Sequence, residues 1–235
     1  MEKIFSQQIR LHDNKKEAIL IGFNGQNFSD KALGSLPQYK GADFIATDRT
    51  ITISYAQYDG QTLPITQIQR CSFSFCKEIE TIKLASHIYK IEWNMYECNN
   101  LQNIEVEPNN DHYQSVDGVL FSKDRKELIG FPSGRTGEYR IPQGTTRICN
   151  CAFKSSKLSH IHIPNSIKHI GTNVFYECKN LKEIIVPTTL QSIEPNCDRA
   201  MEDIKQKFYF NNDVNKTNPM SIKDLIKKLD QRNDS

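Results

Sequence analysis

The feature that most constrains this chain is a short apolar pattern that recurs along the sequence. Residues 79–84, 101–106, 158–163 and 181–186 each carry an aliphatic residue, two variable residues, an isoleucine, one variable residue and a second aliphatic residue. This alternation predicts short β-strands whose apolar residues point inward. Self-similarity at a short period indicates a solenoid, in which consecutive copies stack.

The repeat extends upstream of each predicted strand. In the copy that starts at Ile170, Val174 follows four positions later, Phe175 five positions later and Cys178 eight positions later. Successive starts are 22 or 23 residues apart where no insertion intervenes. One coil of this length cannot bury its own apolar side, so stacked coils are expected to share a continuous core with their strands in a parallel sheet.

This repeat unit resembles the BspA-like (Treponema-type) leucine-rich repeat, most closely over residues 148–164 and 170–187. Residues 113–140 resemble the hairpin insertion of that family, and residues 58–68 resemble the segment that leads into its first repeat. The resemblance implies an α/β-type leucine-rich repeat solenoid with short parallel strands. For function it implies protein-binding and adhesive surfaces, often on the outside of bacteria and some protists.

Three regions are expected. Residues 1–64 would form a β-rich N-terminal cap, residues 65–196 the solenoid with an insertion at 109–147, and residues 197–235 a helical C-terminal cap and tail. Within the first region, the alternating segments 17–23 and 50–58 predict strands, and residues 29–36 predict a short helix. Residues 1–45 are either a plain cap or a small functional module. The insertion either extends a binding surface or only spaces the coils.

The repeat frame fails near the C-terminus, because Asp198 stands where an aromatic residue is expected after Ile193. The ladder, meaning the column of equivalent apolar positions in the stacked coils, is therefore predicted to end at Ile193. We expect it to be followed by a helix over 196–207, a flexible polar linker over 211–220 and a second helix that begins at Ser221. The second helix has one apolar face, formed by Ile222, Leu225, Ile226 and Leu229. That face either packs on the last coil or, with nearby Lys223, Lys227 and Lys228, docks on a partner or an acidic surface.

Composition limits the class of partner and the compartment. A net charge of +2 is too balanced for an electrostatic nucleic-acid binder, and no segment approaches the ~20 apolar residues of a membrane-spanning helix. The N-terminus lacks the apolar region of a secretory signal, so the sequence as written predicts a cytoplasmic protein, or a cell-surface one if a leader was removed. Seven cysteines, an odd number in repeat register, favour buried packing over a disulfide framework.

Catalytic and metal-binding motifs are not found, and no enzyme activity, cofactor or metal is expected. The sequence has no phosphate-binding glycine-rich loop, no nucleophile elbow and no His-Glu-x-x-His. Cys149 and Cys151 lack the second Cys or His pair of a zinc finger. His160 and His162 alternate onto one strand face, but the sequence places no carboxylate or thiol to complete a site with them.

We therefore expect a non-enzymatic protein-binding module, acting inside the cell as an inhibitory, immunity-like or regulatory protein. The alternative is a surface adhesin that binds host or neighbouring-cell proteins. Binding would use the solvent-facing strand residues, and the competing interpretation is a merely solvated sheet face. An exposed Ile185 requires a cover, for which the C-terminal helix is the first candidate. Contacts through the histidines would change the affinity between about pH 5 and 8. The expected binding residues are Thr81, Lys83, Asn103, Glu105, His160, His162, Glu183 and Ile185.

Overall fold

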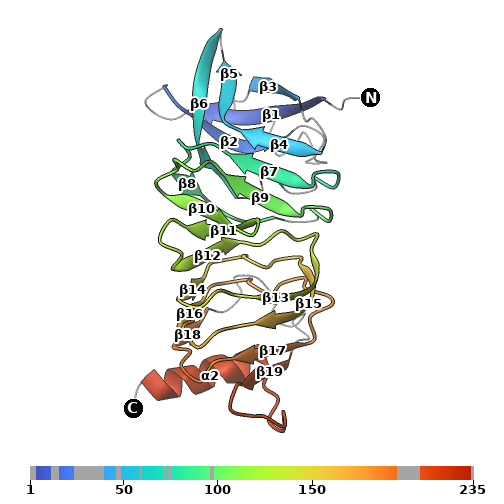
Figure 1. Ribbon diagram of the computed structural model, residues 1–235, viewed down its shortest axis with the longest axis vertical. Coiled ribbons are helices and arrows are strands. Elements are labelled where there is room, and N and C mark those ends of the chain that lie inside the picture. The colour runs from blue at the N-terminus through green and yellow to red at the C-terminus, as the bar shows by residue number, and fades with distance from the viewer. Residues whose placement is uncertain are drawn as a thin grey trace. The chain divides into compact units, whose positions relative to one another are not determined.

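The computed structural model describes residues 4–11, 16–23, 40–45, 49–58, 60–70, 72–73, 76–95, 98–194 and 207–233 (Figure 1). The chain separates into two compact units, Met1–Lys123 and Asp124–Ser235, here called unit 1 and unit 2. The helix predicted over 29–36 lies outside the described residues, as does nearly all of the one predicted over 196–207.

Unit 1 begins with a mixed β-sheet. β1 (Ile4–Leu11) pairs antiparallel with β2 (Ala18–Phe23) and β3 (Lys40–Ile45). β6 (Gln61–Ile68) joins this sheet in parallel to β2, and it also pairs antiparallel with β5 (Tyr55–Tyr58) and parallel with β8 (Lys90–Ile91). The strands predicted over 17–23 and 50–58 are confirmed, the second divided at Ser54. β1 and β3 were not predicted.

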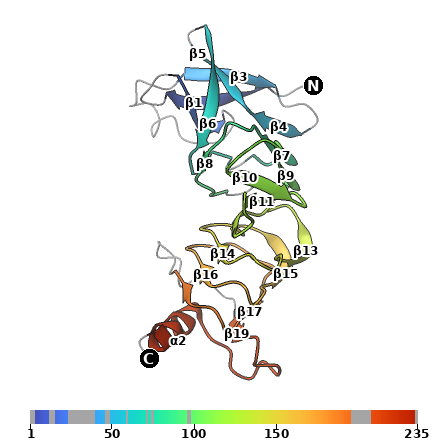
Figure 2. The same cartoon turned by 60° about the vertical axis from the view of Figure 1, so that its left-hand side comes forward.

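The repeat strands of unit 1 form a second sheet. β4 (Thr50–Ile53), β7 (Thr81–Leu84) and β9 (Asn103–Val106) pair in parallel (Figure 2). Their register aligns the buried residues Ile51, Ile82 and Ile104, each at most 1% exposed. The inward-facing isoleucines predicted from the repeat are confirmed, and the sheet also includes β4, which comes before the first predicted repeat strand.

A hairpin follows β9, as the resemblance implies. β10 (Tyr113–Val116) and β11 (Val119–Ser122) pair antiparallel, and both residues of their turn have positive φ, Asp117 at 48° and Gly118 at 71°. This is the turn geometry that suits the twist of a two-residue hairpin. The fully buried Asn110 anchors the hairpin, because its amide donates to the carbonyls of Ala85 and Ile88 in the preceding coil.

Unit 2 is built from two columns of parallel strands. One column consists of β12 (Glu127–Gly130), β14 (Arg147–Ile148), β16 (His169–Ile170) and β18 (Ser192–Ile193). The other consists of β13 (Thr136–Arg140), β15 (Lys157–His162), β17 (Glu183–Val186) and β19 (Lys207–Phe210). The pairing register places four buried aliphatic residues opposite one another on successive strands, which confirms the predicted ladder. They are Leu128, Ile148, Ile170 and Ile193. Both β12 and β13, which lie within 109–147, pair with repeat strands.

A column of phenylalanines fills the core of unit 2. The ring centres of Phe131 and Phe153 are 5.0 Å apart, and those of Phe153 and Phe175 are 6.3 Å apart. Phe208 on β19 continues the column at 6.3 Å from Phe175. The prediction that the ladder ends at Ile193 holds for the column whose last described strand is β18, but it was wrong for the other column, which continues to β19. A further strand covers the edge of β17, and its aromatic residue lies outside the repeat frame.

Residues 211–220 are not the flexible linker that their polar composition suggests. The Asp213 carboxylate accepts hydrogen bonds from the backbone N–H groups of Thr217 and Asn218, at 3.0 and 2.8 Å. Met220 then returns to Phe208, with which it exchanges two backbone hydrogen bonds of 2.9 Å. This segment, here called the 211–220 loop, is therefore an ordered loop beside β19.

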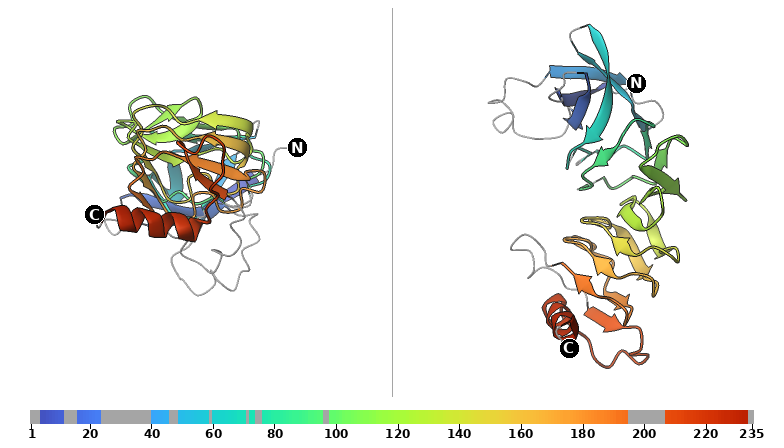
Figure 3. Two further views of the ribbon diagram at one scale, coloured as in Figure 1. Left: turned by 90° about the horizontal axis from the view of Figure 1, so that it is seen from below. Right: turned by 90° about the vertical axis from the view of Figure 1, so that its left-hand side faces the viewer.

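The chain ends in α2 (Ile222–Asn233), which lies beside β18 and β19 (Figure 3). Ser221 caps the helix, because its hydroxyl accepts a 3.2 Å hydrogen bond from the Asp224 N–H. Ile222, Leu225 and Leu229 are at most 5% exposed. Of the two roles considered for this apolar face, packing on the last coil is confirmed.

Candidate protein-binding surface

The eight expected binding residues fall into two groups of four, one on each unit. Thr81 and Lys83 lie at outward positions of β7, and Asn103 and Glu105 at outward positions of β9. We call these four the unit 1 face. Register places Lys83 opposite Glu105, and Lys83 Nζ lies 3.3 Å from Glu105 Oε2. The exposed charges of the unit 1 face therefore neutralise each other.

The other four residues lie at outward positions of unit 2. His160 and His162 are on β15, and Glu183 and Ile185 are on β17. Register places His162 opposite Ile185. The outward side of β13, β15, β17 and β19 is here called the unit 2 face.

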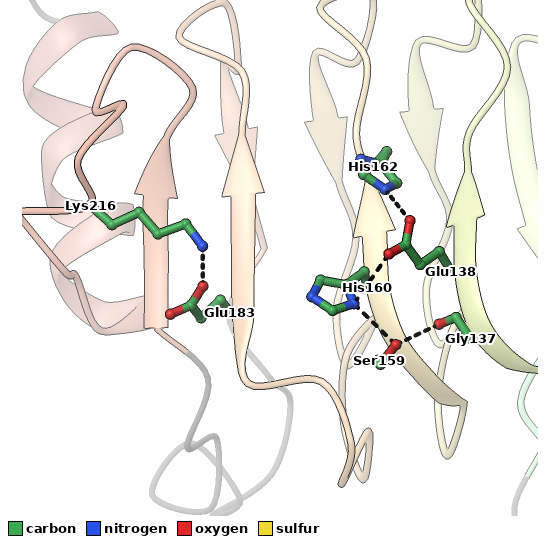
Figure 4. Close-up of polar contacts among 7 residues, drawn as sticks. All are labelled: Gly137, Glu138, Ser159, His160, His162, Glu183 and Lys216. Atoms are coloured by element: carbon green, nitrogen blue, oxygen red, sulfur yellow. Dashed lines mark hydrogen bonds and ion pairs between the residues drawn. The ribbon is translucent and has the colours of Figure 1, made fainter.

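A carboxylate that the sequence analysis missed joins the two histidines. Glu138 on β13 places Oε2 3.1 Å from His162 Nε2 and Oε1 3.7 Å from His160 Nδ1 (Figure 4). The hydrogen bond with His162 is the main cause that lowers the pKa of Glu138, and the charges of both histidines and Arg140 lower it further. The expectation that no carboxylate accompanies the histidines was wrong.

The sequence does hold a signal for Glu138. Ile141 and Pro142 occupy the positions that Ile163 and Pro164 occupy at the end of the next repeat. Counting back three residues from Ile141 and from Ile163 therefore aligns Glu138 with His160. The signal was weak because Thr136 stands where the other copies begin with an aliphatic residue.

Glu183 is held in a similar way by the 211–220 loop. The Lys216 ammonium forms an ion pair with the Glu183 carboxylate (Figure 4). This hydrogen bond lowers the pKa of Glu183 and raises the pKa of Lys216. Lys216 Nζ also lies 6.0 Å from the ring centre of Tyr209, which is outward-facing but only 5% exposed.

Ile185 remains open to solvent, with 41% of its surface exposed. The hypothesis that the C-terminal helix covers it was wrong. α2 instead packs by β18 and β19, where the Arg232 guanidinium lies 4.4 Å from the centre of the Phe210 ring. Ile185 therefore sits between His162 on one neighbouring strand and Tyr209 on the other.

The described cysteines support the packing role that their repeat positions suggest. Cys98 is 1% exposed, and its Sγ lies 2.6 Å from the Phe73 carbonyl oxygen. Burial raises the pKa of Cys149 and of Cys178 to about 12, which leaves little reactive thiolate at neutral pH. In the described part of the chain, the cysteines that form no disulfide are Cys76, Cys98, Cys149, Cys151 and Cys178.

Among the described residues, no group of three or more His, Cys, Asp or Glu side chains is arranged to hold a metal ion. No helix in that part of the chain is both long enough and apolar enough to span a membrane.

Several solved structures resemble this one in part. The pneumococcal vaccine antigen PcpA is 25% identical, with 58% of this chain and 40% of that chain covered and a TM-score of 0.46. A leucine-rich repeat protein from Eubacterium ventriosum is 18% identical, with 89% and 72% covered and a TM-score of 0.46. The leucine-rich repeat protein of Treponema pallidum is 18% identical, with 80% and 61% covered and a TM-score of 0.34. The chain thus spans less than half the length of the pneumococcal structure.

Sequence comparison places the repeat in a family. No curated protein matches the chain. The model of the BspA type leucine-rich repeat region matches in six copies, over residues 60–136 and 131–225. Those ranges cover most of the chain and include every repeat strand from β7 to β19. This chain belongs to the BspA-type leucine-rich repeat family.

Proposed function

We propose that this protein is a non-enzymatic binding module that recognises a protein partner through its outward strand faces. The observation that carries this proposal is the exposure of Ile185. Tyr209 occupies the equivalent position on the next strand and is covered by the chain itself, whereas Ile185 is not. An exposed aliphatic side chain on an ordered face can receive an apolar group of a partner protein, because removing both apolar surfaces from water is favourable.

The surroundings of Ile185 are fixed before any partner arrives. Parallel pairing orders the backbones of β15 and β17, and ion pairs hold Glu138 and Glu183. A surface whose side chains are already ordered loses less conformational entropy on binding. The unit 1 face, with Thr81, Asn103 and the Lys83–Glu105 pair, offers a second contact area, in which the two charges balance.

We assign this binding to the cell interior, where the protein would act as an inhibitor or regulator. The cysteines of the described residues support that assignment, because thiols at repeat positions that form no disulfide suit a reducing compartment. The competing function is that of an adhesin at the cell surface. Fractionation of the source cells with an antibody against the protein distinguishes the two, since an adhesin would be found in the surface fraction.

The binding proposal is tested by affinity capture from a lysate of the source cells, with cross-linking and mass spectrometry. We expect one protein to be recovered in stoichiometric amount and cross-linked near β15 or β17. Ile185→Asp should abolish the recovery without unfolding the protein, because the side chain is exposed. Gln143→Glu, in an exposed turn outside both faces, is the matched control. Equal recovery by Ile185→Asp and the control would contradict the proposal.

The outer side of α2 is the remaining candidate surface, and a second variant tests it. Lys223 and Lys227 are exposed on the helix, so their double reversal to glutamate changes that surface without disturbing its buried side. We expect this variant to retain the partner. If the helix variant loses the partner while Ile185→Asp retains it, binding would be assigned to the helix.

A further inference from the structure

The negative charges of the unit 2 face are already engaged within the protein. Glu138 faces both His162 and His160, at 3.1 and 3.7 Å, and Glu183 is paired with Lys216. The pKa values of both carboxylates are lowered by these contacts, so each is ionised at physiological pH and already accepts a hydrogen bond within the protein. A basic ligand would therefore have to compete with existing contacts.

Two cations on the same face are not engaged in this way. Arg140 lies opposite His162 on β13, and Lys207 lies opposite Glu183 on β19. Both side chains are exposed, and within the described part of the structure neither forms an ion pair. Arg140 attracts the Glu138 carboxylate, and Lys207 the Glu183 carboxylate, only weakly and at longer range. This attraction is a minor cause of the lowered pKa values of the two carboxylates.

We propose that the unit 2 face binds an acidic segment of a partner protein, which seats an apolar side chain on Ile185 and directs carboxylates toward Arg140 and Lys207. This inference rests on the proposed function and adds the chemistry of the partner. The complement of an unengaged cation is an anion, and the complement of an exposed isoleucine is an apolar side chain.

The exposed isoleucine distinguishes a protein partner from a nucleic acid. A nucleic acid would gain from contacts of its phosphates with Arg140 and Lys207 but not from Ile185, since exposed bases stack on aromatic rings rather than on an aliphatic side chain. The proposal is also confined to one face. In unit 1, Lys83 and Glu105 pair with each other, so that face carries no comparable excess of positive charge.

A displayed library of random linear peptides, selected on the full-length protein, tests this inference. Selected peptides should combine Asp or Glu with a large aliphatic or aromatic residue. A synthetic peptide from the selection should bind Arg140→Glu/Lys207→Glu at least about tenfold more weakly than the wild type, and also lose affinity for Ile185→Asp. Lys223→Glu/Lys227→Glu makes the same change in net charge on α2 and should leave the affinity unchanged.

The inference and the proposed function can fail separately. The inference would be overturned if the selected peptides lacked acidic residues, or if none of them depended on Ile185 for binding. It would also be overturned if the wild type and the Arg140→Glu/Lys207→Glu variant bound the peptide equally. A single-stranded RNA oligomer whose binding requires Arg140 and Lys207 but not Ile185 would overturn it as well. If the cellular partner is still lost with Ile185→Asp in any of these cases, the binding function stands and only its acidic chemistry is wrong.

Discussion

Glu138 and His162 are 24 residues apart in the sequence, yet Glu138 Oε2 lies 3.1 Å from His162 Nε2 across neighbouring strands. Lys83 and Glu105 form a similar link between two coils of unit 1. The cause is the coil length, which brings equivalent outward positions of successive coils side by side. The side chains of these two pairs are therefore held by their neighbours, although they are exposed.

The first prediction concerns the titration of Glu138. Its pKa in the folded protein should lie below the ordinary value of 4.5 and should rise toward that value in His162→Asn, because the hydrogen bond from His162 is the main cause of the shift. Since the folded pKa is lowered, the stabilisation is present above the ordinary value and is lost as pH falls through the folded one. Carboxyl-carbon NMR titration measures both values, and identical midpoints would refute the link.

A second prediction concerns the phenylalanine column. Phe153 is fully buried between Phe131 and Phe175, so Phe153→Ala should lower the free energy of unfolding by about 3–5 kcal/mol. Val214, which is 86% exposed, provides the control, and Val214→Ala should change the free energy of unfolding by less than about 0.5 kcal/mol. Urea denaturation followed by circular dichroism gives both values. Similar stabilities for the two variants would mean that the column is not part of the core.

The anchoring of the hairpin gives a third prediction. Besides its two donated bonds, the Asn110 side chain accepts hydrogen bonds from the backbone N–H groups of His112 and Tyr113, at 2.9 and 2.8 Å. Asn110→Ala would leave several buried groups unpaired and should cost about 3 kcal/mol. Asn100 donates one exposed bond, to the Lys77 carbonyl, so Asn100→Ala should cost less than about 1 kcal/mol. The same denaturation measurement checks the difference, and a small effect of both changes would exclude the anchoring role.

A fourth prediction concerns thiol reactivity. Burial raises the pKa of Cys149 and Cys178 to about 12, so neither should be alkylated appreciably by iodoacetamide at about pH 8 in the folded protein. Both should react fully after denaturation. Peptide mass spectrometry resolves each site, and rapid labelling of Cys178 in the native protein would show that its coil opens readily.

The sequence predicts most of the fold where the copies keep their frame. Ile148, Ile170 and Ile193 are in the register that their spacing requires, and Ile82 and Ile104 face inward as the alternation indicates. These features depend on local periodicity and on stacking, which are both properties of the repeat itself.

The features that the sequence analysis missed depend on contacts between distant segments. β19 lies outside the repeat frame, and Phe208 is recognisable as a core residue only once Phe175 is seen beside it. The 211–220 loop is polar, and its order arises from bonds to Asp213 and from the pairing of Lys216 with Glu183. The outward position of Ile185 was predicted, but the hypothesis that α2 covers it was wrong, because periodicity does not determine where α2 packs.

The most direct test of the binding function is the affinity of the purified cellular partner for the wild type and for Ile185→Asp, measured by isothermal titration calorimetry. We predict at least an approximately tenfold weaker affinity for Ile185→Asp, the loss expected for an apolar anchor replaced by a charge. Gln143→Glu should bind as the wild type does. Equal affinity of the wild type and Ile185→Asp would contradict the assignment of binding to the unit 2 face.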